Sequence, residues 1–198
     1  MMYIEDKITI QVATERHATY VAEICQVIAE SARIRGTGIA KREPAYILSK
    51  MKDGKAIIAL DGDKLAGFCY IESWGKDKNY VANSGLIVLA GYRKSGLGKQ
   101  IKKAAFELSR VKFPEAKLFG ITTSLAVLRI NHALGYRPVH FSQLTNDVEF
   151  WSGCKGCINY PILESTSRTN CLCTAMLYDP EEKKQQENSQ VEEKKIAV

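Results

Sequence analysis

The stretch from Gly85 to Lys99 carries the residues best suited to bind an anion. It runs from an apolar, strand-like segment through a turn with Gly96 and Gly98 into a segment with helical spacing. The start of a helix offers unpaired backbone N–H groups and a partial positive charge. Because glycine has no Cβ, a ligand can come close to the backbone there. Positive charge is added by three basic side chains, Arg93, Lys94 and Lys99. The segment therefore predicts a site for a phosphate-like anion.

Two familiar phosphate-binding motifs do not fit this segment. A P-loop reads G-x-x-x-x-G-K-[ST], but Arg93 stands at the first glycine position and Gln100 replaces the Ser or Thr. A Rossmann fingerprint that begins at Gly96 would need its third glycine where Ile101 stands. Neither motif is therefore predicted. An ordinary turn between a strand and a helix remains the alternative to an anion site.

Four of the six cysteines form two close pairs late in the chain: Cys154 and Cys157, then Cys171 and Cys173. Four thiolates in two pairs are a ligand set for structural zinc, which would leave no open position for catalysis. The spacing differs from a zinc ribbon, because the second pair has one intervening residue. The alternatives are four reduced cysteines, some buried in strands, or a redox pair.

The order of predicted elements places the anion loop in the middle of an α/β (α+β) domain. Hydrophobic periodicity predicts strands near 7–12, 55–60, 65–74, 80–89, 118–122, 138–141 and 173–177. Helices are predicted from residue 14 to about 36 and over 44–52, 96–112 and 124–134. Hairpins followed by alternating strands and helices indicate a mixed, mostly antiparallel sheet with helices on both faces. We expect one domain over 1–145, a cysteine-containing extension over 146–178 packed on it, and a disordered charged tail over 179–198.

Composition narrows the class of protein further. The 198 residues are 45% hydrophobic and 25% charged, with a net charge of +6. No apolar run approaches the roughly 20 residues of a membrane helix, and the N-terminus has no secretory pattern, so we expect a cytoplasmic protein without membrane contact. No aromatic and basic stripe of a nucleic-acid binder is present. The positive charge fits a polyanionic cofactor with an acidic substrate, and a homodimer stays open.

The anion loop also carries a resemblance to a known family. Residues Val88 to Lys99 resemble motif A of the GNAT acetyltransferases, R/Q-x-x-G-x-G/A, with Arg93, Gly96 and Gly98 at its fixed positions. The stretch from Ser124 to Pro138 resembles motif B, which ends in a Leu-Gly-Phe/Tyr turn. The likeness covers about residues 7 to 145. It implies the GNAT fold and acetyl-CoA, or another acyl-CoA, as cosubstrate.

The resemblance also implies where the cosubstrate lies. The pyrophosphate would be bound beside Arg93 by the backbone N–H groups of Lys94, Ser95, Gly96, Leu97, Gly98 and Lys99. The backbone of Ile87 and Val88 would pair with the pantetheine arm as with an added strand. A splay between this strand and the one near Leu118 would admit the thioester.

The implied reaction is attack of an amine on the thioester carbonyl. Glu72 is the candidate base, because it lies at the end of a central strand near the expected cleft; a solvent-facing glutamate is the alternative. A backbone N–H between Leu86 and Val88 would stabilise the oxyanion. Asn131 holds the position where the family often has a tyrosine acid, and it could instead contact the cofactor sulfur. Tyr80 and Tyr92 are alternative acids.

The family usually builds its acceptor site from the first two helices and their connection. Here that connection carries four cations, Arg33, Arg35, Lys41 and Arg42, which suit a carboxylate-bearing acceptor. A solvated basic loop is the alternative. The sequence is also similar to a bacterial GNAT group associated with arginine biosynthesis, which favours glutamate, acylated at its α-amine, as the small acceptor. Acylation of a protein lysine or N-terminus and a catalytically silent acyl-CoA sensor are the other hypotheses.

Overall fold

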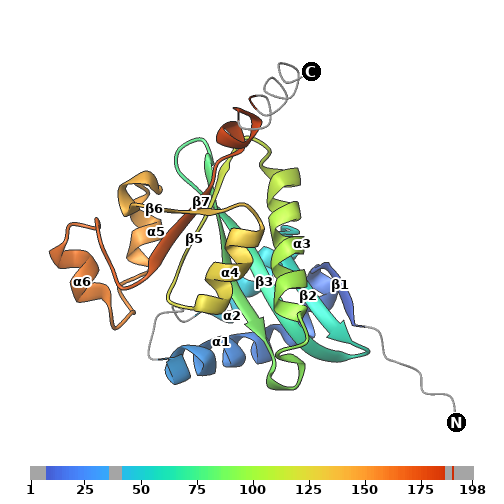
Figure 1. The fold of residues 1–198 in the computed structure, drawn as a ribbon. Helices are drawn as coiled ribbons and strands as arrows, with labels where there is room; N and C mark the ends of the chain where they lie inside the picture. The colour runs from blue at the N-terminus through green and yellow to red at the C-terminus, as the bar shows by residue number, and fades with distance from the viewer. Residues whose placement is uncertain (1–7, 36–41, 186–188, 190–198) are drawn as a thin grey trace, which may run out of the picture.

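A seven-stranded sheet forms the centre of the molecule (Figure 1). The computed structural model describes residues 8–35, 42–185 and 189. Its strands follow the spatial order β1-β2-β3-β4-β5-β7-β6, and only β4 and β5 pair in parallel. The strands are β1 (Thr9–Val12), β2 (Ala56–Asp61), β3 (Lys64–Trp74), β4 (Tyr80–Val88), β5 (Lys117–Thr122), β6 (Arg137–Val139) and β7 (Thr174–Tyr178). The predicted mixed, mostly antiparallel sheet is thereby confirmed.

Helices cover both faces of this sheet (Figure 1). They are α1 (Val21–Arg35), α2 (Pro44–Lys52), α3 (Leu97–Lys112), α4 (Leu125–Ala133), α5 (Val148–Ser152) and α6 (Tyr160–Ser165), with 3-10 turns η1 (Glu15–Tyr20), η2 (Ala90–Tyr92) and η3 (Phe141–Gln143). None of the helices in the described ranges is both long and apolar enough to cross a membrane.

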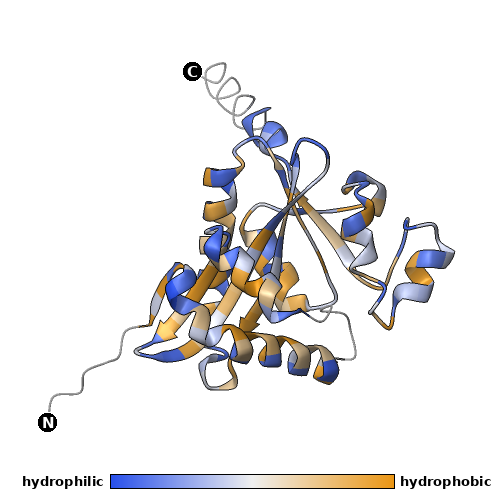
Figure 2. Cartoon of the chain, turned by 180° about the vertical axis from the view of Figure 1, so that it is seen from behind, coloured by the Kyte–Doolittle hydropathy of each residue, from blue (hydrophilic) through white to orange (hydrophobic). Residues whose placement is uncertain are grey.

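The packing of each helix follows from the spacing of its apolar residues. Ile24 and Ile28 of α1 bury against Phe68 on one face of the sheet. Leu97 and Ile101 of α3 bury on the opposite face. Each such side chain contributes on the order of 1.5–3 kcal/mol when fully buried. Figure 2 shows the result along α1, where apolar and polar colours alternate as a helix with one inward stripe requires.

Strands β4 and β5 form a fork. They pair only where Tyr80–Ala82 lies beside Lys117–Phe119, although β4 continues to Val88 and β5 to Thr122. A β-bulge lies just beyond this point, because Ser84 is opposite Tyr70 while Ile87 is opposite Phe68. The fork is the splay expected between these two strands, and it opens the sheet at its centre.

Gly85 makes the bulge possible. Its φ of +65° is a left-handed conformation, and a Cβ there would lie 2.5 Å from Tyr70 Cε1. Both the backbone angle and the space therefore require a glycine. Since the bulge leaves Gly85 and Leu86 without a partner residue on β3, the backbone at the fork has polar groups outside that ladder.

The extension is joined to the sheet by β7, which lies between β5 and β6. Trp151 and Leu163 of the extension pack on Phe119 and Leu177 in a third core cluster. The boundary at residue 145 stays a prediction, but the last strand of the extension is an integral part of the sheet.

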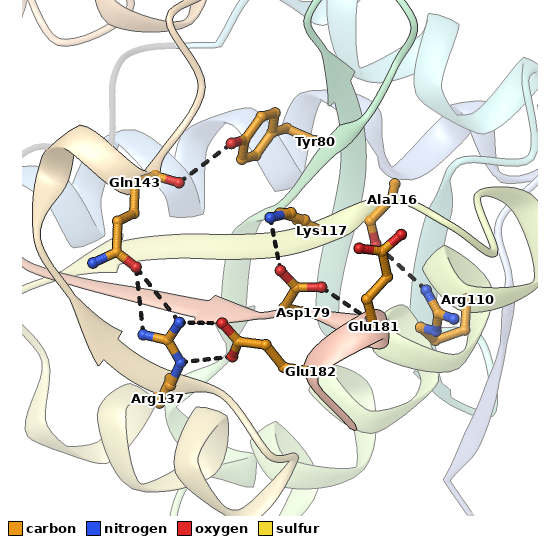
Figure 3. A network of polar contacts seen from close by, with 9 residues as sticks. All are labelled: Tyr80, Arg110, Ala116, Lys117, Arg137, Gln143, Asp179, Glu181 and Glu182. Atoms are coloured by element: carbon orange, nitrogen blue, oxygen red, sulfur yellow. Dashed lines mark hydrogen bonds and ion pairs between the residues drawn. The ribbon is translucent and has the colours of Figure 1, made fainter. Parts of the chain in front are cut away.

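The start of the expected disordered tail contacts the domain. The chain is helical from 180 to 185, Asp179 pairs with Lys117 at 2.7 Å, and Glu182 pairs with Arg137 at 2.6 Å (Figure 3). The acids directly follow β7 and so meet cations at the ends of neighbouring strands. A disordered tail was predicted over 179–198. Of these residues, 186–188 and 190–198 lie outside the described part of the chain.

Candidate functional site

The anion loop lies between the end of β4 and the start of α3. Gly96 is the N-cap residue of α3 with a φ of +84°, and no side chain caps the helix. A Cβ on Gly96 would meet nothing within 4 Å, and one on Gly98 would meet only Val88 Cγ2, at 3.5 Å. The side chains of Arg93, Lys94 and Lys99 are exposed. The start of α3 is therefore a basic surface on which backbone N–H groups can be approached closely.

Contacts within the loop refine this assignment. Arg93 Nε donates to Val88 O at 3.0 Å, so its side chain ties the loop to the end of β4. The Lys99 N–H bonds to Gly96 O at 3.0 Å, and Ser95 Oγ lies 3.4 Å from the Leu97 nitrogen. An anion at this loop would therefore compete with one ordinary backbone hydrogen bond and one long side-chain contact.

A cavity of about 460 Å³ begins at the fork. Ser84, Gly85 and Leu86 of β4 line one side of it, and Gly120, Ile121 and Thr122 of β5 line the other. Because the two strands have stopped pairing here, residues of both strands can line the same cavity. The edge of β4 that ends in Ile87 and Val88 leads from this cavity to the anion loop.

Glu72 lies in the wall of the cavity on β3. Its Oε2 forms an ion pair with Lys50 Nζ and accepts a hydrogen bond from Tyr46 OH at 3.0 Å. Lys55 Nζ lies 3.8 Å from Oε1. The side chain is only 13% exposed, so it is not the solvent-facing strand end that was the alternative. It is a largely buried carboxylate in contact with two cations.

Arg42 is the cation of the predicted acceptor segment that lines the cavity. Its Nε donates to Tyr70 OH at 2.6 Å, and its guanidinium lies 5.6 Å from the centre of the Tyr46 ring. Arg33 is exposed on α1. The side chain of Arg35 and all of Lys41 lie outside the described residues. The structure thus brings Arg42, but not Arg33, to the cavity.

Asn131 of α4 lies on the other side of the fork and lines the same cavity. It is 1% exposed, and its Oδ1 has no hydrogen-bond partner in the part of the chain that the structure describes. It packs against β5, where a Cβ on Gly120 would lie 3.5 Å from Asn131 Nδ2, an ordinary contact. A buried amide oxygen without a partner fits a donor supplied by a ligand.

The two alternative tyrosine acids lie elsewhere. Tyr92 OH donates to Asp61 Oδ2 at 2.8 Å, and Tyr80 OH donates to Gln143 O at 3.3 Å (Figure 3). Neither side chain is among those that line the cavity. The structure therefore gives no support to either tyrosine as the acid.

All four late cysteines line the cavity on the side of the extension: Cys154, Cys157, Cys171 and Cys173. They are free thiols. Burial raises the pKa of Cys154 to about 11 and that of Cys173 to about 12. Among the described residues, no group of three or more His, Cys, Asp or Glu side chains is arranged to hold a metal ion. The predicted zinc site is therefore not supported, and the cysteines form part of the cavity wall.

Several residues of the site were not found from the sequence. Tyr46, Tyr70 and Trp74 line the cavity, and so does Lys102 of α3. The one available signal for Lys102 was its place seven residues before Ser109, a spacing that puts two polar side chains on one helical face. Both residues are buried.

Comparison with known proteins agrees with this geometry. The model of the acetyltransferase (GNAT) family matches residues 27–124, about half of the chain. The fold is similar to that of N-acetylglutamate synthase from Neisseria gonorrhoeae, solved with coenzyme A and N-acetyl-glutamate, with a TM-score of 0.61 and 13% identity over 87% of this chain and 35% of the synthase. This chain therefore spans about a third of the length of that synthase.

Two further structures are similar along nearly their whole length. One is yncA from Salmonella typhimurium, solved with its cofactor acetyl-CoA, with a TM-score of 0.57 and 13% identity over 88% of this chain and 94% of that one. The other is an acetyltransferase of the GNAT family from Staphylococcus aureus Mu50, with a TM-score of 0.62 and 12% identity over 88% and 99%. At these identities the likeness concerns the fold alone. The comparison with curated proteins gave no match.

Proposed function

Because the chain belongs to the acetyltransferase (GNAT) family and is therefore an acyl-CoA-dependent acyltransferase, we propose that it transfers an acetyl or related acyl group to the primary amine of a small, carboxylate-bearing acceptor such as an amino acid. Glutamate is the acceptor that we favour. The observation that supports this proposal is the fork, which opens into a cavity whose wall carries Glu72 and Arg42, with the uncapped start of α3 following the same strand β4 in the chain.

Acyl-CoA would lie along the edge of β4. Its pyrophosphate would bind the N–H groups at the start of α3, with positive charge from Arg93, Lys94 and Lys99. Its pantetheine arm would follow Ile87 and Val88, where β4 has separated from β5. The thioester would then reach the fork, where the unpartnered Asn131 Oδ1 is available to a donor of the cofactor.

The acceptor would enter from the opposite face, between Arg42 and Glu72. An amino acid carries a carboxylate, which suits the Arg42 guanidinium, and an ammonium group, which suits the Glu72 carboxylate. A cavity of about 460 Å³ is in the size range of small-molecule sites. The Neisseria synthase was solved with N-acetyl-glutamate. For this chain, one cation and one carboxylate in the wall would suit any α-amino acid, and glutamate is favoured by the sequence resemblance described above.

Chemistry at the fork would then need few further groups. An amine of pKa about 10 must lose a proton before it attacks, and Glu72 would receive that proton directly or through a water molecule. The nitrogen forms a bond to the carbonyl carbon, and negative charge develops on the carbonyl oxygen. With the thioester at the fork, the Leu86 N–H next to the bulge at Gly85 would stabilise that charge.

A thiol-release assay over a panel of amino acids and peptides tests this proposal. Release with an acidic amino acid, reduced in Arg42→Met, is the expected result. Release with peptides alone would replace the small acceptor by a protein lysine or N-terminus. Binding of acetyl-CoA without release on any amine would favour the silent sensor, and no binding would overturn the proposed placement of the cofactor.

A further inference from the structure

Lys102 is an ammonium group buried beneath the centre of the sheet. The residue is 2% exposed, and its Nζ donates to Asn83 O at 3.3 Å. It also lies 5.9 Å from the centre of the Tyr136 ring. Burial lowers the pKa of Lys102 to about 8. A buried charge normally has a charged partner, because leaving water costs several kcal/mol per ion. A carbonyl oxygen and an aromatic ring are weak substitutes for such a partner.

Among the described residues, Cys69 and Tyr136 are two titratable groups that face this ammonium, and both are neutral near pH 7. Burial raises the pKa of the Cys69 thiol of β3 to about 11. Burial also raises the pKa of Tyr136, whose hydroxyl donates to Asn83 Oδ1 at 2.9 Å. The Asn83 amide in turn donates to Ser109 Oγ at 2.7 Å. These contacts fix Asn83 but bring no negative charge to Lys102.

The position of Lys102 relative to the fork indicates what its partner is. Pairing between β4 and β5 ends at Ala82, and Lys102 binds the carbonyl of the next residue along β4. Lys102 lies on α3 and Asn131 on α4, and both line the fork cavity from the same face of the sheet. This is the face on which the cofactor would run from the start of α3, so the thioester sulfur would arrive between these two side chains.

We propose that Lys102 is the acid that protonates the departing thiolate of coenzyme A, in the place of the tyrosine that this chain lacks. The inference rests on the cofactor placement proposed above. When the C–N bond has formed, the C–S bond breaks and its electron pair stays on sulfur. Lys102 then gives one proton to the sulfur, which leaves coenzyme A as a thiol and Lys102 neutral. Lys102 recovers a proton from the solvent. The proton that the acceptor amine gave up passes through Glu72 to the solvent.

The acidity of the two groups suits this step. A free thiol has a pKa near 8.5, close to that of Lys102, so the proton can move without a large penalty in either direction. The product S–H would then have an acceptor in Asn131 Oδ1, which has no partner in the described part of the molecule. Lys102 would thus supply a proton and Asn131 would receive the finished thiol.

The test measures the thiol of bound coenzyme A, which needs no acceptor. The ultraviolet absorbance of the thiolate is followed against pH with coenzyme A bound, and the same titration with desulfo-coenzyme A is subtracted to remove the protein thiols. In the wild type the bound thiol should be about tenfold or more acidic than free coenzyme A, because a cation lies beside it. In Lys102→Met and Lys102→Gln the thiol should return to its free acidity.

Controls separate this role from a structural one. Lys102→Gln keeps a donor for Asn83 O but carries no charge. If Lys102 had only a structural role, the thiol of bound coenzyme A would therefore titrate in Lys102→Gln as it does in the wild type. Lys103→Met removes a charge from an exposed neighbour on the same helix, whose side chain is 63% exposed, and should not change the titration. If coenzyme A binds but the thiol titrates identically in wild type and both Lys102 variants, Lys102 is not the acid. If coenzyme A does not bind to the wild type, the cofactor placement itself is wrong.

Discussion

Gly98→Ala should change the stability of the free protein and its affinity for coenzyme A in opposite directions. Gly98 is the second residue of α3 and does not have a positive φ. An alanine in a helix is more favourable than glycine by about 0.5–1 kcal/mol. The added Cβ would meet only Val88 Cγ2, at 3.5 Å, an ordinary contact. The free variant should therefore melt at the wild-type temperature or slightly above it.

The same methyl group lies in the seam between α3 and β4, along which the cofactor would run. The family motif accepts alanine at this position, but here the methyl group would stand beside Val88 Cγ2 in the path proposed for the cofactor, so we expect coenzyme A to bind about tenfold more weakly, a loss of about 1.4 kcal/mol. At a concentration of about 100 times the wild-type Kd, coenzyme A adds about 2.7 kcal/mol to the free energy of unfolding. At about 2–4 °C per kcal/mol for a chain of this size, the melting temperature should rise by roughly 5–11 °C in the wild type and by about half as much in the variant.

Differential scanning fluorimetry with and without coenzyme A measures both effects at once, and calorimetry gives the Kd. Gly156→Ala is the matched control, because a Cβ there meets nothing within 4 Å and the residue lies in the extension, far along the chain from α3. It should leave the coenzyme A shift unchanged. A folded Gly98→Ala variant with wild-type affinity would refute the reasoning that the cofactor follows this seam.

Three further predictions concern other parts of the site. Glu72→Gln should slow turnover by about tenfold or more and lower the free energy of unfolding by about 1–3 kcal/mol, because Lys50 loses its carboxylate partner. The double variant with Lys50→Met should recover stability but not turnover. Wild-type turnover in Glu72→Gln would exclude Glu72 as the base. Metal analysis of protein purified without added zinc should give a stoichiometry near zero, and one zinc per chain would show that the four cysteines assemble a site. Arg137→Gln should lower the melting temperature at neutral pH. The bond from Arg137 lowers the pKa of Glu182, so the pair stabilises the fold fully above the usual glutamate pKa. The difference should shrink as the pH falls below that value and vanish below the lowered pKa of the folded state; a difference that persists in strong acid would contradict this.

The parts of the fold that depend on local sequence could be predicted well. The glycines and the apolar spacing around α3 placed its start within one residue, because a helix start is determined by neighbouring residues. The position of β7 could not be predicted. This strand follows the whole extension in the sequence, yet it pairs between β5 and β6. Pairing between segments so far apart in the chain leaves no periodic signal in one sequence.

The chemistry of the site was predictable in type but not in detail. The end of β3 identified Glu72 as a cleft residue. Its ion pair with Lys50 depends on how α2 packs on the sheet, which the sequence does not show. Lys102 was hidden for a similar reason, since a lysine on an amphipathic helix usually reaches solvent. The cysteines were recognised as a group, but their place in a cavity wall rather than a metal site depends on tertiary packing.

The most direct test of the account is a titration of the backbone amides by NMR with coenzyme A and, separately, with pantetheine, which lacks the phosphates. If the N–H groups at the start of α3 hold the pyrophosphate, the amide signals from Lys94 to Lys99 should shift with coenzyme A and stay in place with pantetheine. Binding of coenzyme A that leaves these six amides unmoved would contradict the account.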